Sequence, residues 1–204
     1  ACDERGVRHL TLYAFSHANW QRPTEEVEML MALCGKFAEQ HRDEWIERSI
    51  RLEVIGDLDE LRTSTRQSVE QTVAATRHGK RMTLTLALGY GGRNDLIGAV
   101  RAIAARAQAG LLLPEEIDES SLRGFMSTHR LPDPDLVIRT GGEKRLSDFL
   151  LFECSMAELF FCDAMWPEFD AVILDEAIAA YGRRQRRFGR TPEQLSGLVG
   201  SCGA

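Results

Sequence analysis

The segment Ile138-Arg-Thr-Gly-Gly-Glu-Lys-Arg-Leu-Ser147 joins an apolar strand, residues 136–139, to a predicted helix over residues 147–156. Arginine offers a fixed fork of charged donors, and a pair of glycines lets the backbone approach an anion closely. Ser147 would cap a helix whose free N–H groups and dipole favour negative charge. The segment therefore predicts an anion site where a strand meets a helix. The alternative is an ordinary charged loop followed by a good N-cap.

Strands and helices alternate on both sides of this segment. Apolar runs predict strands over residues 7–15, 50–55, 82–88, 136–139 and 159–162, and helical periodicity predicts the main helices over 23–41, 58–77, 94–107, 119–128, 147–156 and 170–188. This order favours an α/β fold, with one mostly parallel central sheet and helices on both faces, in a single domain over residues 1–204. Ligands of such folds gather at the C-terminal ends of the strands, where Ser16, Tyr90 and Arg139 fall.

The composition is that of an ordinary soluble protein, with 44% hydrophobic and 27% charged residues in a chain of 204. A net charge of −6 gives no sign of a nucleic-acid binder. Five cysteines without CxxC spacing give no support for zinc and favour a reducing cytosol. No apolar run approaches the length of a membrane span. A cytoplasmic protein that touches a membrane surface is expected. One cluster of basic residues stands out in this acidic chain, and it consists of Arg183, Arg184, Arg186, Arg187 and Arg190. The cluster either forms a solvated helix end or supplies positive charge to a substrate or a membrane surface.

Five segments in order carry a resemblance that spans nearly the whole chain. They are Leu12-Tyr-Ala-Phe-Ser-His-Ala-Asn-Trp-Gln-Arg-Pro23, Ile55-Gly-Asp-Leu58, Tyr90-Gly-Gly-Arg93, Leu131-Pro-Asp-Pro-Asp135, and residues 136–151 followed by Glu158-Leu-Phe-Phe161 and Trp166-Pro-Glu-Phe169. Together they resemble the cis-prenyltransferases, the undecaprenyl diphosphate synthase-like enzymes.

The resemblance implies a Mg²⁺-dependent homodimeric prenyltransferase. Such an enzyme condenses isopentenyl diphosphate with an allylic diphosphate, for example farnesyl diphosphate, to give a Z-polyprenyl diphosphate and pyrophosphate. The chemistry requires cations for two polyanionic head groups, Mg²⁺ for the charge on the departing pyrophosphate, and an apolar tunnel for the growing chain. The tunnel is expected to be lined by Leu30, Met31, Leu33, Met82 and Leu84.

The same resemblance assigns roles to individual residues. Arg139, Arg145 and Ser147 would bind the diphosphate of isopentenyl diphosphate. Ser16 and Asn19 would assist proton removal or orient the substrate, and Arg22 would support diphosphate binding. Glu158 would help to hold Mg²⁺, and in this family that carboxylate can come from the dimer partner. Arg93 would fix loops near the site.

Each assignment has a simpler rival. Ser16 and Asn19 are also suited to cap the turn before Pro23. Trp20 is expected in the packed core rather than against a substrate, and His17 is expected to face solvent. Glu158 could be an exposed carboxylate at a strand edge.

The chain departs from the family at its start. The family begins with a strand and an Asp-Gly-Asn-Gly-Arg-type loop whose aspartate holds Mg²⁺, followed by a helix, and none of these precedes Ala1. We therefore expect a fragment of an active synthase that lacks its N-terminal strand and helix. A non-catalytic partner subunit of a cis-prenyltransferase is the first alternative. An irregular short-chain prenyl synthase on the same fold, and a phosphate-ester enzyme outside the family, are the others. The length of the product stays open.

Overall fold

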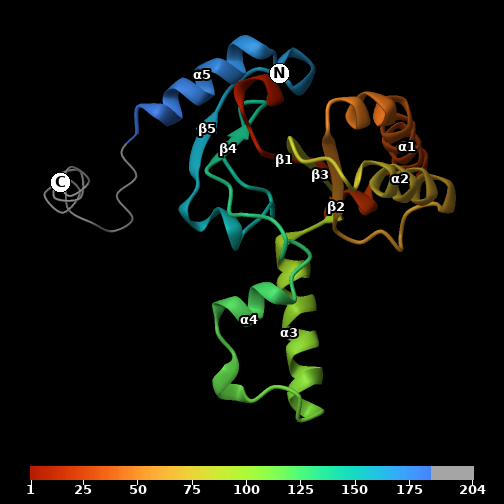
Figure 1. Cartoon of the computed structure of the whole chain (residues 1–204), viewed down its shortest axis with the longest axis vertical. Helices are drawn as coiled ribbons and strands as arrows, with labels where there is room; N and C mark the ends of the chain where they lie inside the picture. Colours follow the sequence, from red (N-terminus) through yellow and green to blue (C-terminus); the bar gives the residue numbers. More distant parts are fainter. Residues whose placement is uncertain (185–204) are drawn as a thin grey trace, which may run out of the picture. The chain divides into compact units, whose positions relative to one another are not determined.

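The computed structural model describes residues 1–184 (Figure 1). The main elements in this part of the chain are β1 (His9–Ser16), α1 (Thr24–Glu47), β2 (Ile50–Ile55), α2 (Thr63–Thr76), β3 (Met82–Tyr90), α3 (Gly92–Gln108), α4 (Glu119–Gly124), β4 (Leu136–Arg139), β5 (Glu158–Phe161) and α5 (Ala171–Gly182). Short 3₁₀ turns lie at Asp3–Arg5, His17–Gln21, Pro114–Glu116, Glu153–Met156 and Trp166–Glu168.

The chain forms two compact units, and the first is discontinuous in sequence. Unit 1 contains residues 1–132 and then residues 147–152, which we call the Ser147 segment. Unit 2 contains residues 133–146 and continues from residue 153. The chain therefore leaves unit 1 after α4, builds part of unit 2, and returns to unit 1 for six residues before β5.

Unit 1 is built on a parallel sheet of three strands in the order β1–β3–β2. Leu84 at the centre of β3 pairs with Leu10 of β1 on one side and with Leu52 of β2 on the other. Every residue of β3 is buried. Its sequence, Met-Thr-Leu-Thr-Leu-Ala-Leu-Gly-Tyr, is correspondingly close to a continuous apolar run, as expected for a central parallel strand.

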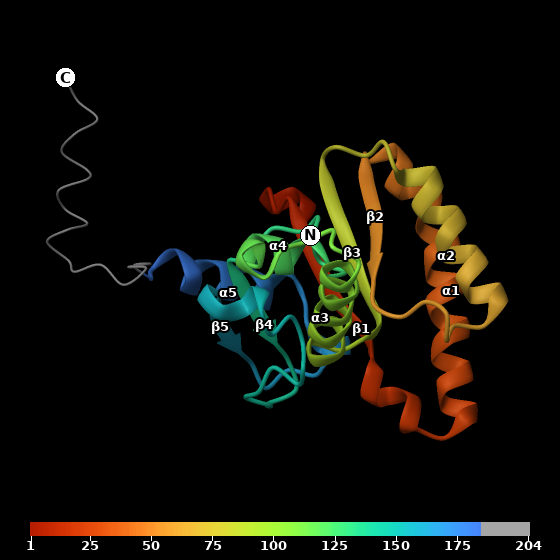
Figure 2. The same ribbon diagram turned by 90° about the horizontal axis from the view of Figure 1, so that it is seen from below.

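Helices α1 and α2 pack side by side against this sheet (Figure 2). Met31 of α1 and Val69 of α2 are each 1% exposed and belong to one core with Leu84. Two buried threonines of α2 satisfy their hydroxyl groups on the neighbouring helix, because Thr65 Oγ1 donates to Met31 O (3.2 Å) and Thr72 Oγ1 donates to Ala38 O (3.3 Å). The helix pair is thus joined by both apolar packing and hydrogen bonds.

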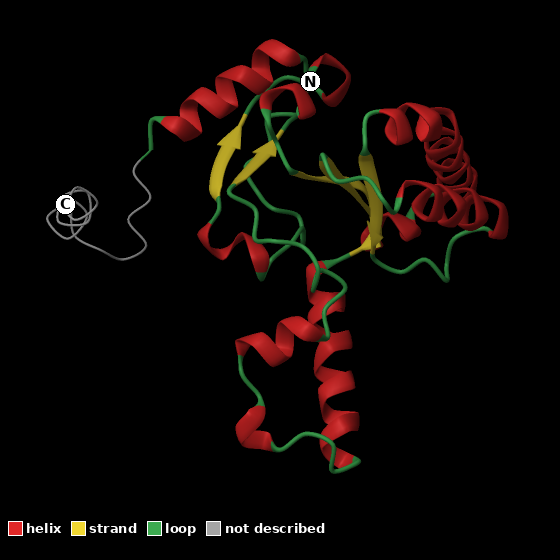
Figure 3. Cartoon of the chain, viewed as in Figure 1, coloured by secondary structure: helices red, strands yellow, loops and turns green. Residues whose placement is uncertain are grey.

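Unit 2 contains a second parallel pair, β4 and β5, whose arrows point the same way in Figure 3. Leu136 lies beside Glu158, and Arg139 lies beside Phe161. Helix α5 follows, with the Asp170 carboxylate accepting hydrogen bonds from the backbone N–H groups of Val172 (2.9 Å) and Ile173 (3.0 Å). Asp170 therefore caps α5 in the ordinary way.

The predicted α/β class with parallel strands is confirmed, and β2 and β4 have the predicted bounds. The strands divide between two sheets rather than one. Helix α1 continues past the expected end to Glu47 because Trp45 is buried in the core. The last predicted helix is observed as Ala171–Gly182, and its residues 185–188 lie outside the described part of the chain.

The helix predicted over residues 147–156 is wrong. Ser147, Asp148 and Leu150 have φ values of 54°, 65° and 42°, which no right-handed helix contains. Only Glu153–Met156 is helical, as a single 3₁₀ turn. Ser147 is accordingly not a helix N-cap, and the expected anion site on helix N–H groups is absent here.

The residues expected to line a tunnel divide into two groups. Met31, Met82 and Leu84 are buried in the core between α1, α2 and the sheet, and Leu30 packs against it. Leu33 is 62% exposed, so its side chain does not reach that core.

The cysteines in the described residues are free, and burial raises the pKa of the Cys154 thiol to about 12. Residues 1–184 contain no group of three potential metal ligands. None of the helices in this range is both long and apolar enough to cross a membrane.

Candidate functional site

The first group of candidate residues lies at the C-terminal edge of the unit 1 sheet. Ser16 ends β1 and pairs in register with Tyr90, which ends β3. The backbone N–H of Ser16 donates to Asn19 Oδ1 (2.9 Å), so the amide of Asn19 closes the 3₁₀ turn His17–Gln21. The simpler reading of Asn19 as a turn-capping residue is therefore confirmed, while a catalytic role for either residue stays a prediction.

Trp20 and Arg22 follow on the same turn. The Trp20 ring packs edge-on against Phe15 at 4.8 Å and borders the core, as expected. Arg22 precedes α1, and its Nη1 lies 2.8 Å from Glu26 Oε1 in an exposed ion pair. A diphosphate that binds Arg22 would have to compete with this carboxylate, which in water holds the arginine only weakly.

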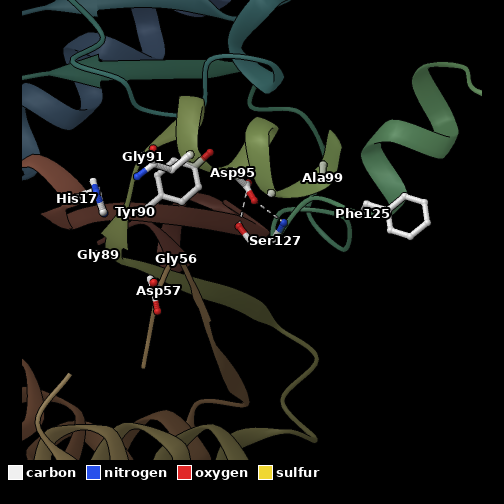
Figure 4. A pocket seen from close by; sticks show the side chains of 12 residues that line it. His17, Gly56, Asp57, Gly89, Tyr90, Gly91, Asp95, Ala99, Phe125 and Ser127 are labelled. Atoms are coloured by element: carbon white, nitrogen blue, oxygen red, sulfur yellow. Dashed lines mark hydrogen bonds between the residues drawn. The ribbon is translucent and has the colours of Figure 1, made fainter. Parts of the chain in front are cut away.

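A cleft of about 290 Å³ lies at the same edge of the sheet (Figure 4). Its lining includes His17 after β1, Asp57 after β2 and Tyr90 at the end of β3. On the far side Asp95 accepts two hydrogen bonds of 2.9 Å from Ser127, one from its N–H and one from its hydroxyl. The cleft thus opens where parallel-sheet proteins bind their ligands, and His17 is exposed there as predicted.

The Ser147 segment lies at this same edge of the sheet. The hydroxyl of Tyr13 on β1 lies 3.1 Å from Tyr90 O and 3.3 Å from Ser147 O. The Asp148 carboxylate accepts a hydrogen bond of 3.0 Å from the backbone N–H of Arg93. Ser147 is therefore held beside the strand ends that carry Ser16 and Tyr90, and the backbone N–H of Arg93 helps to hold the segment there, while a role for the Arg93 side chain stays a prediction.

The loop over residues 140–146 lies in unit 2 and follows β4, which ends at Arg139. Gly141 and Gly142 both have left-handed backbones, with φ of 80° and 73°. Their N–H groups donate to Ala164 O (2.8 Å) and Cys162 O (3.0 Å). The glycines therefore shape a turn against the chain after β5, and their amides are not available to an anion. Any anion here must be held by arginine side chains.

Two arginines border this turn. Arg139 is half-buried at the C-terminal end of β4, and Arg145 is exposed and ion-paired with Glu143. The loop thus carries two guanidinium groups, and one of them is paired in the free protein with an exposed carboxylate. A diphosphate could displace that carboxylate and bind both arginines.

Glu158 lies at the other end of unit 2. It begins β5 beside Leu136, three residues before the position that pairs with Arg139. At about 3.3 Å per residue, these strand positions are about 10 Å apart. The Glu158 carboxylate forms an ion pair with Arg184 at the end of α5. Glu158 and Arg139 are thus not brought together within unit 2.

The structure therefore groups Ser16, Asn19, Arg22 and Ser147 in unit 1. Arg139, Arg145 and Glu158 belong to unit 2, where Glu158 and Arg139 lie at opposite ends of the β4–β5 pair. Sequence reasoning missed Tyr13 and Asp148. Both stand inside quoted motifs, but their contacts join positions far apart in the sequence. A carboxylate directly after Ser147 was the one available signal.

These features define an α/β enzyme whose polar residues gather at the C-terminal ends of parallel strands. The family model described as putative undecaprenyl diphosphate synthase matches residues 1–189. The chain belongs to this family, and it is a prenyltransferase of the cis-prenyl type.

Relatives and solved structures agree. The chain is 44% identical over 184 residues to a ditrans,polycis-undecaprenyl-diphosphate synthase, (2E,6E)-farnesyl-diphosphate specific, from Micrococcus luteus, covering 90% of this chain and 74% of the relative. It is 42% identical to an isoprenyl transferase of Chlorobaculum tepidum, covering 96% and 74%. The crystal structure of lavandulyl diphosphate synthase from Lavandula x intermedia, in complex with dimethylallyl diphosphate, superposes with a TM-score of 0.89 at 33% identity, covering 92% and 81%. A probable undecaprenyl diphosphate synthase from Campylobacter jejuni gives 0.81 at 30% identity, covering 93% and 86%.

Proposed function

We propose that this chain condenses isopentenyl diphosphate with an allylic diphosphate, farnesyl diphosphate in the first instance, to form a Z-polyprenyl diphosphate. In this reaction the bond between C1 and oxygen of the allylic substrate breaks and pyrophosphate leaves. C4 of isopentenyl diphosphate bonds to C1, and C2 loses a proton as the new double bond forms. The Micrococcus luteus relative, named for its farnesyl diphosphate specificity, supports this choice of allylic substrate.

The observation that carries the proposal is the arginine loop at the end of β4. Arg139 and Arg145 flank a glycine turn whose own amides are occupied by backbone carbonyls, so the loop offers guanidinium groups rather than N–H groups to an anion. Paired, charge-assisted hydrogen bonds from arginine match the oxygen geometry of a diphosphate. We assign these residues and Ser147 to the head group of isopentenyl diphosphate.

The residues after β1 are assigned to the reacting carbons. Ser16 and Asn19 share a turn at the strand end, and that turn is held in shape by the hydrogen bond between them. A fixed hydroxyl and amide can orient isopentenyl diphosphate and help to receive the proton lost from C2. Arg22 supports diphosphate binding from the start of α1 once Glu26 is displaced.

Magnesium is the cofactor that we propose, and Glu158 would help to hold it. When bound, Mg²⁺ takes up negative charge on the departing pyrophosphate. Mg²⁺ is usually held by one or two carboxylates together with substrate phosphates, so a single carboxylate fits its chemistry. Arg184 would have to release Glu158 on binding.

A homodimer would explain the position of Glu158. Its separation from Arg139 along the paired strands keeps it from the arginine loop of the same unit. A second copy of the chain could bring its own Glu158 to that loop, which supports the proposal that each site uses carboxylate and arginines from different subunits. Because the product carries a hydrocarbon chain, we also propose a cytoplasmic enzyme that works at a membrane surface.

The metal assignment predicts the behaviour of Glu158→Ala. Loss of the carboxylate should raise the Mg²⁺ concentration required for half-maximal turnover by about tenfold, as for removal of one charged ligand contact. The measurement is a magnesium titration of the turnover rate. Arg184→Met provides a control of opposite sign, because it frees Glu158 and should lower the requirement. Superimposable titration curves for Glu158→Ala and the unsubstituted chain would contradict the assignment.

The test of the proposed function is mass-spectrometric analysis of products after incubation with farnesyl diphosphate, isopentenyl diphosphate and Mg²⁺. A ladder of five-carbon additions is expected, from this chain or from one to which the family's N-terminal strand and Asp-Gly-Asn-Gly-Arg-type loop have been restored, and it would also give the chain length. A non-catalytic partner subunit would instead make no product and would raise the turnover of a complete cis-prenyltransferase added to it.

One observation favours a second candidate, an irregular short-chain prenyl synthase. The solved structure of lavandulyl diphosphate synthase, which holds dimethylallyl diphosphate, superposes with a TM-score of 0.89. Incubation with dimethylallyl diphosphate alone separates the two candidates. A product from that substrate by itself would favour the irregular synthase, and its absence beside a ladder in the first assay would favour the polyprenyl synthase.

A further inference from the structure

Asp148 connects the Ser147 segment to the start of α3. Its Oδ1 accepts a hydrogen bond from Arg93 N (3.0 Å), and its backbone oxygen accepts one from Gly92 N (2.7 Å). Gly92 and Arg93 are the first two residues of α3, and such N–H groups have no partner within their own helix. The carboxylate also faces the positive end of the helix dipole. The N-cap position of α3 is occupied by Gly91, which has no side chain, and Asp148 supplies the capping carboxylate from more than fifty residues later in the sequence.

Tyr13 supplies a second attachment. Its hydroxyl lies within hydrogen-bonding distance of both Tyr90 O (3.1 Å) and Ser147 O (3.3 Å), so it joins the end of β3 to the segment. Its ring stacks on Phe149, with centroids 4.6 Å apart and an angle of 20° between planes. Residues 147 to 149 are therefore each fixed to β1, β3 or α3.

The glycine pair after Tyr90 is explained by this docking. A Cβ atom on Gly91 would lie 2.7 Å from Asp148 Oδ2. One on Gly92 would lie 3.0 Å from Leu151 Cγ and 3.1 Å from Leu151 N. The Ser147 segment therefore approaches the β3–α3 turn closely enough that side chains at both positions would push it away.

The segment is also strained. Ser147, Asp148 and Leu150 all have positive φ values, a backbone region that costs free energy for residues with a side chain. Such conformations persist only where the surroundings impose them. Because the contacts of Asp148 and Tyr13 impose this one, the position of Ser147 depends on them.

We propose that Asp148 is a positioning residue for isopentenyl diphosphate and acts through Ser147. The inference rests on the proposed function, in which Ser147 contacts the diphosphate. The charge of Asp148 repels a diphosphate, so its contribution to binding must come from fixing the segment. Its carboxylate holds the α3 N-terminus on one side, while the adjacent Ser147 faces solvent at the strand ends on the other.

The test compares Asp148→Ala with Asp148→Asn. The alanine variant loses the cap and should raise KM for isopentenyl diphosphate about tenfold while kcat changes less than about twofold, because ground-state and transition-state binding are weakened alike. The asparagine variant keeps an acceptor oxygen of the same shape and tolerates positive φ, so it should restore KM to near the original value. Tyr13→Phe removes a single hydroxyl and should raise KM by about threefold.

Hydrogen–deuterium exchange gives a readout independent of turnover. Exchange of the peptide covering residues 147–152 should accelerate in Asp148→Ala and not in Asp148→Asn, with peptides of α1 and α2 unchanged. Asp118→Ala is the matched control, because Asp118 caps α4 in unit 1 through the N–H of Ser121 (2.7 Å). It should leave both KM and exchange of the Ser147 segment unaltered.

The outcomes separate the inference from the function on which it rests. Equal KM values for Asp148→Ala and the unsubstituted chain would overturn the positioning role, as would a raised KM without faster exchange of the segment. A raised KM that Asp148→Asn fails to restore would show that the charge, not the cap, matters. If the unsubstituted chain neither binds isopentenyl diphosphate in calorimetry nor turns it over, the proposed function is refuted. The proposed role of Asp148 is then refuted as well.

Discussion

Arg139→Ala and Arg145→Ala should each weaken binding of isopentenyl diphosphate by about 2 kcal/mol, which is about 30-fold in Kd. Each change removes a guanidinium group from the loop after β4, where the glycine amides are already bonded to Cys162 O and Ala164 O. The amides of Gly141 and Gly142 therefore cannot replace the lost contact. The measurement is isothermal titration of each variant with isopentenyl diphosphate at fixed salt.

Two variants of the same loop control this experiment. Lys144→Ala removes one positive charge without removing a fork of donors, and should weaken binding by about twofold, since exposed charges are screened. Glu143→Gln removes the carboxylate that pairs with Arg145 in the free protein, and should strengthen binding. If both arginine variants retain the original affinity, the loop does not bind the diphosphate.

Gly56→Ala should destabilise the protein by about 3 kcal/mol, the sum of backbone strain and steric overlap. Gly56 follows β2 with φ of 106°, where a side chain is strained. Its Cβ would lie 2.1 Å from Leu88 O and 3.0 Å from Tyr90 N. Those atoms belong to the central strand β3, which is bonded on both sides and cannot move aside. The measurement is urea unfolding followed by far-ultraviolet circular dichroism, with the m-value checked for constancy.

Gly98→Ala is the matched control and has the opposite expected sign. Gly98 lies inside α3, and an added Cβ would meet no atom within 4 Å. Alanine should therefore stabilise the chain by about 0.5–1 kcal/mol, through helix propensity alone. Unchanged stability in Gly56→Ala would mean that the turn after β2 relaxes without disturbing β3.

The bounds of a strand could be predicted from the local sequence where a glycine or turn follows the apolar run directly. Ile50–Ile55 is bounded by Gly56, and Leu136–Arg139 by the turn at Gly141, so the apolar runs and the punctuation agree. The candidate residues on the arginine loop were likewise accessible, because arginine and glycine have few roles in such a turn. The division of the strands into two sheets has no local signal, since pairing joins residues distant in sequence.

The helix predicted over residues 147–156 was wrong for a related physical reason. Ser147-Asp-Phe-Leu-Leu has the composition of a capped amphipathic helix, and local propensity favours that reading. Tertiary contacts override it, because Asp148 caps α3 rather than its own segment, and Phe149 stacks on Tyr13. The segment thus caps a helix elsewhere in the chain instead of forming one itself, and nothing within twenty residues could reveal that partner.

The discontinuity of unit 1 has a consequence for the order of folding. Tyr13 and Ser147 are separated by 134 residues, whereas β1, β2 and β3 with their helices lie within the first ninety. Contacts of such high sequence separation carry a large loop-closure cost and tend to form late. On a ribosome the sheet can assemble before Ser147 has been synthesised. The molecule would then reach a native-like core while its diphosphate site is still unmade, and acquisition of activity should lag behind acquisition of structure.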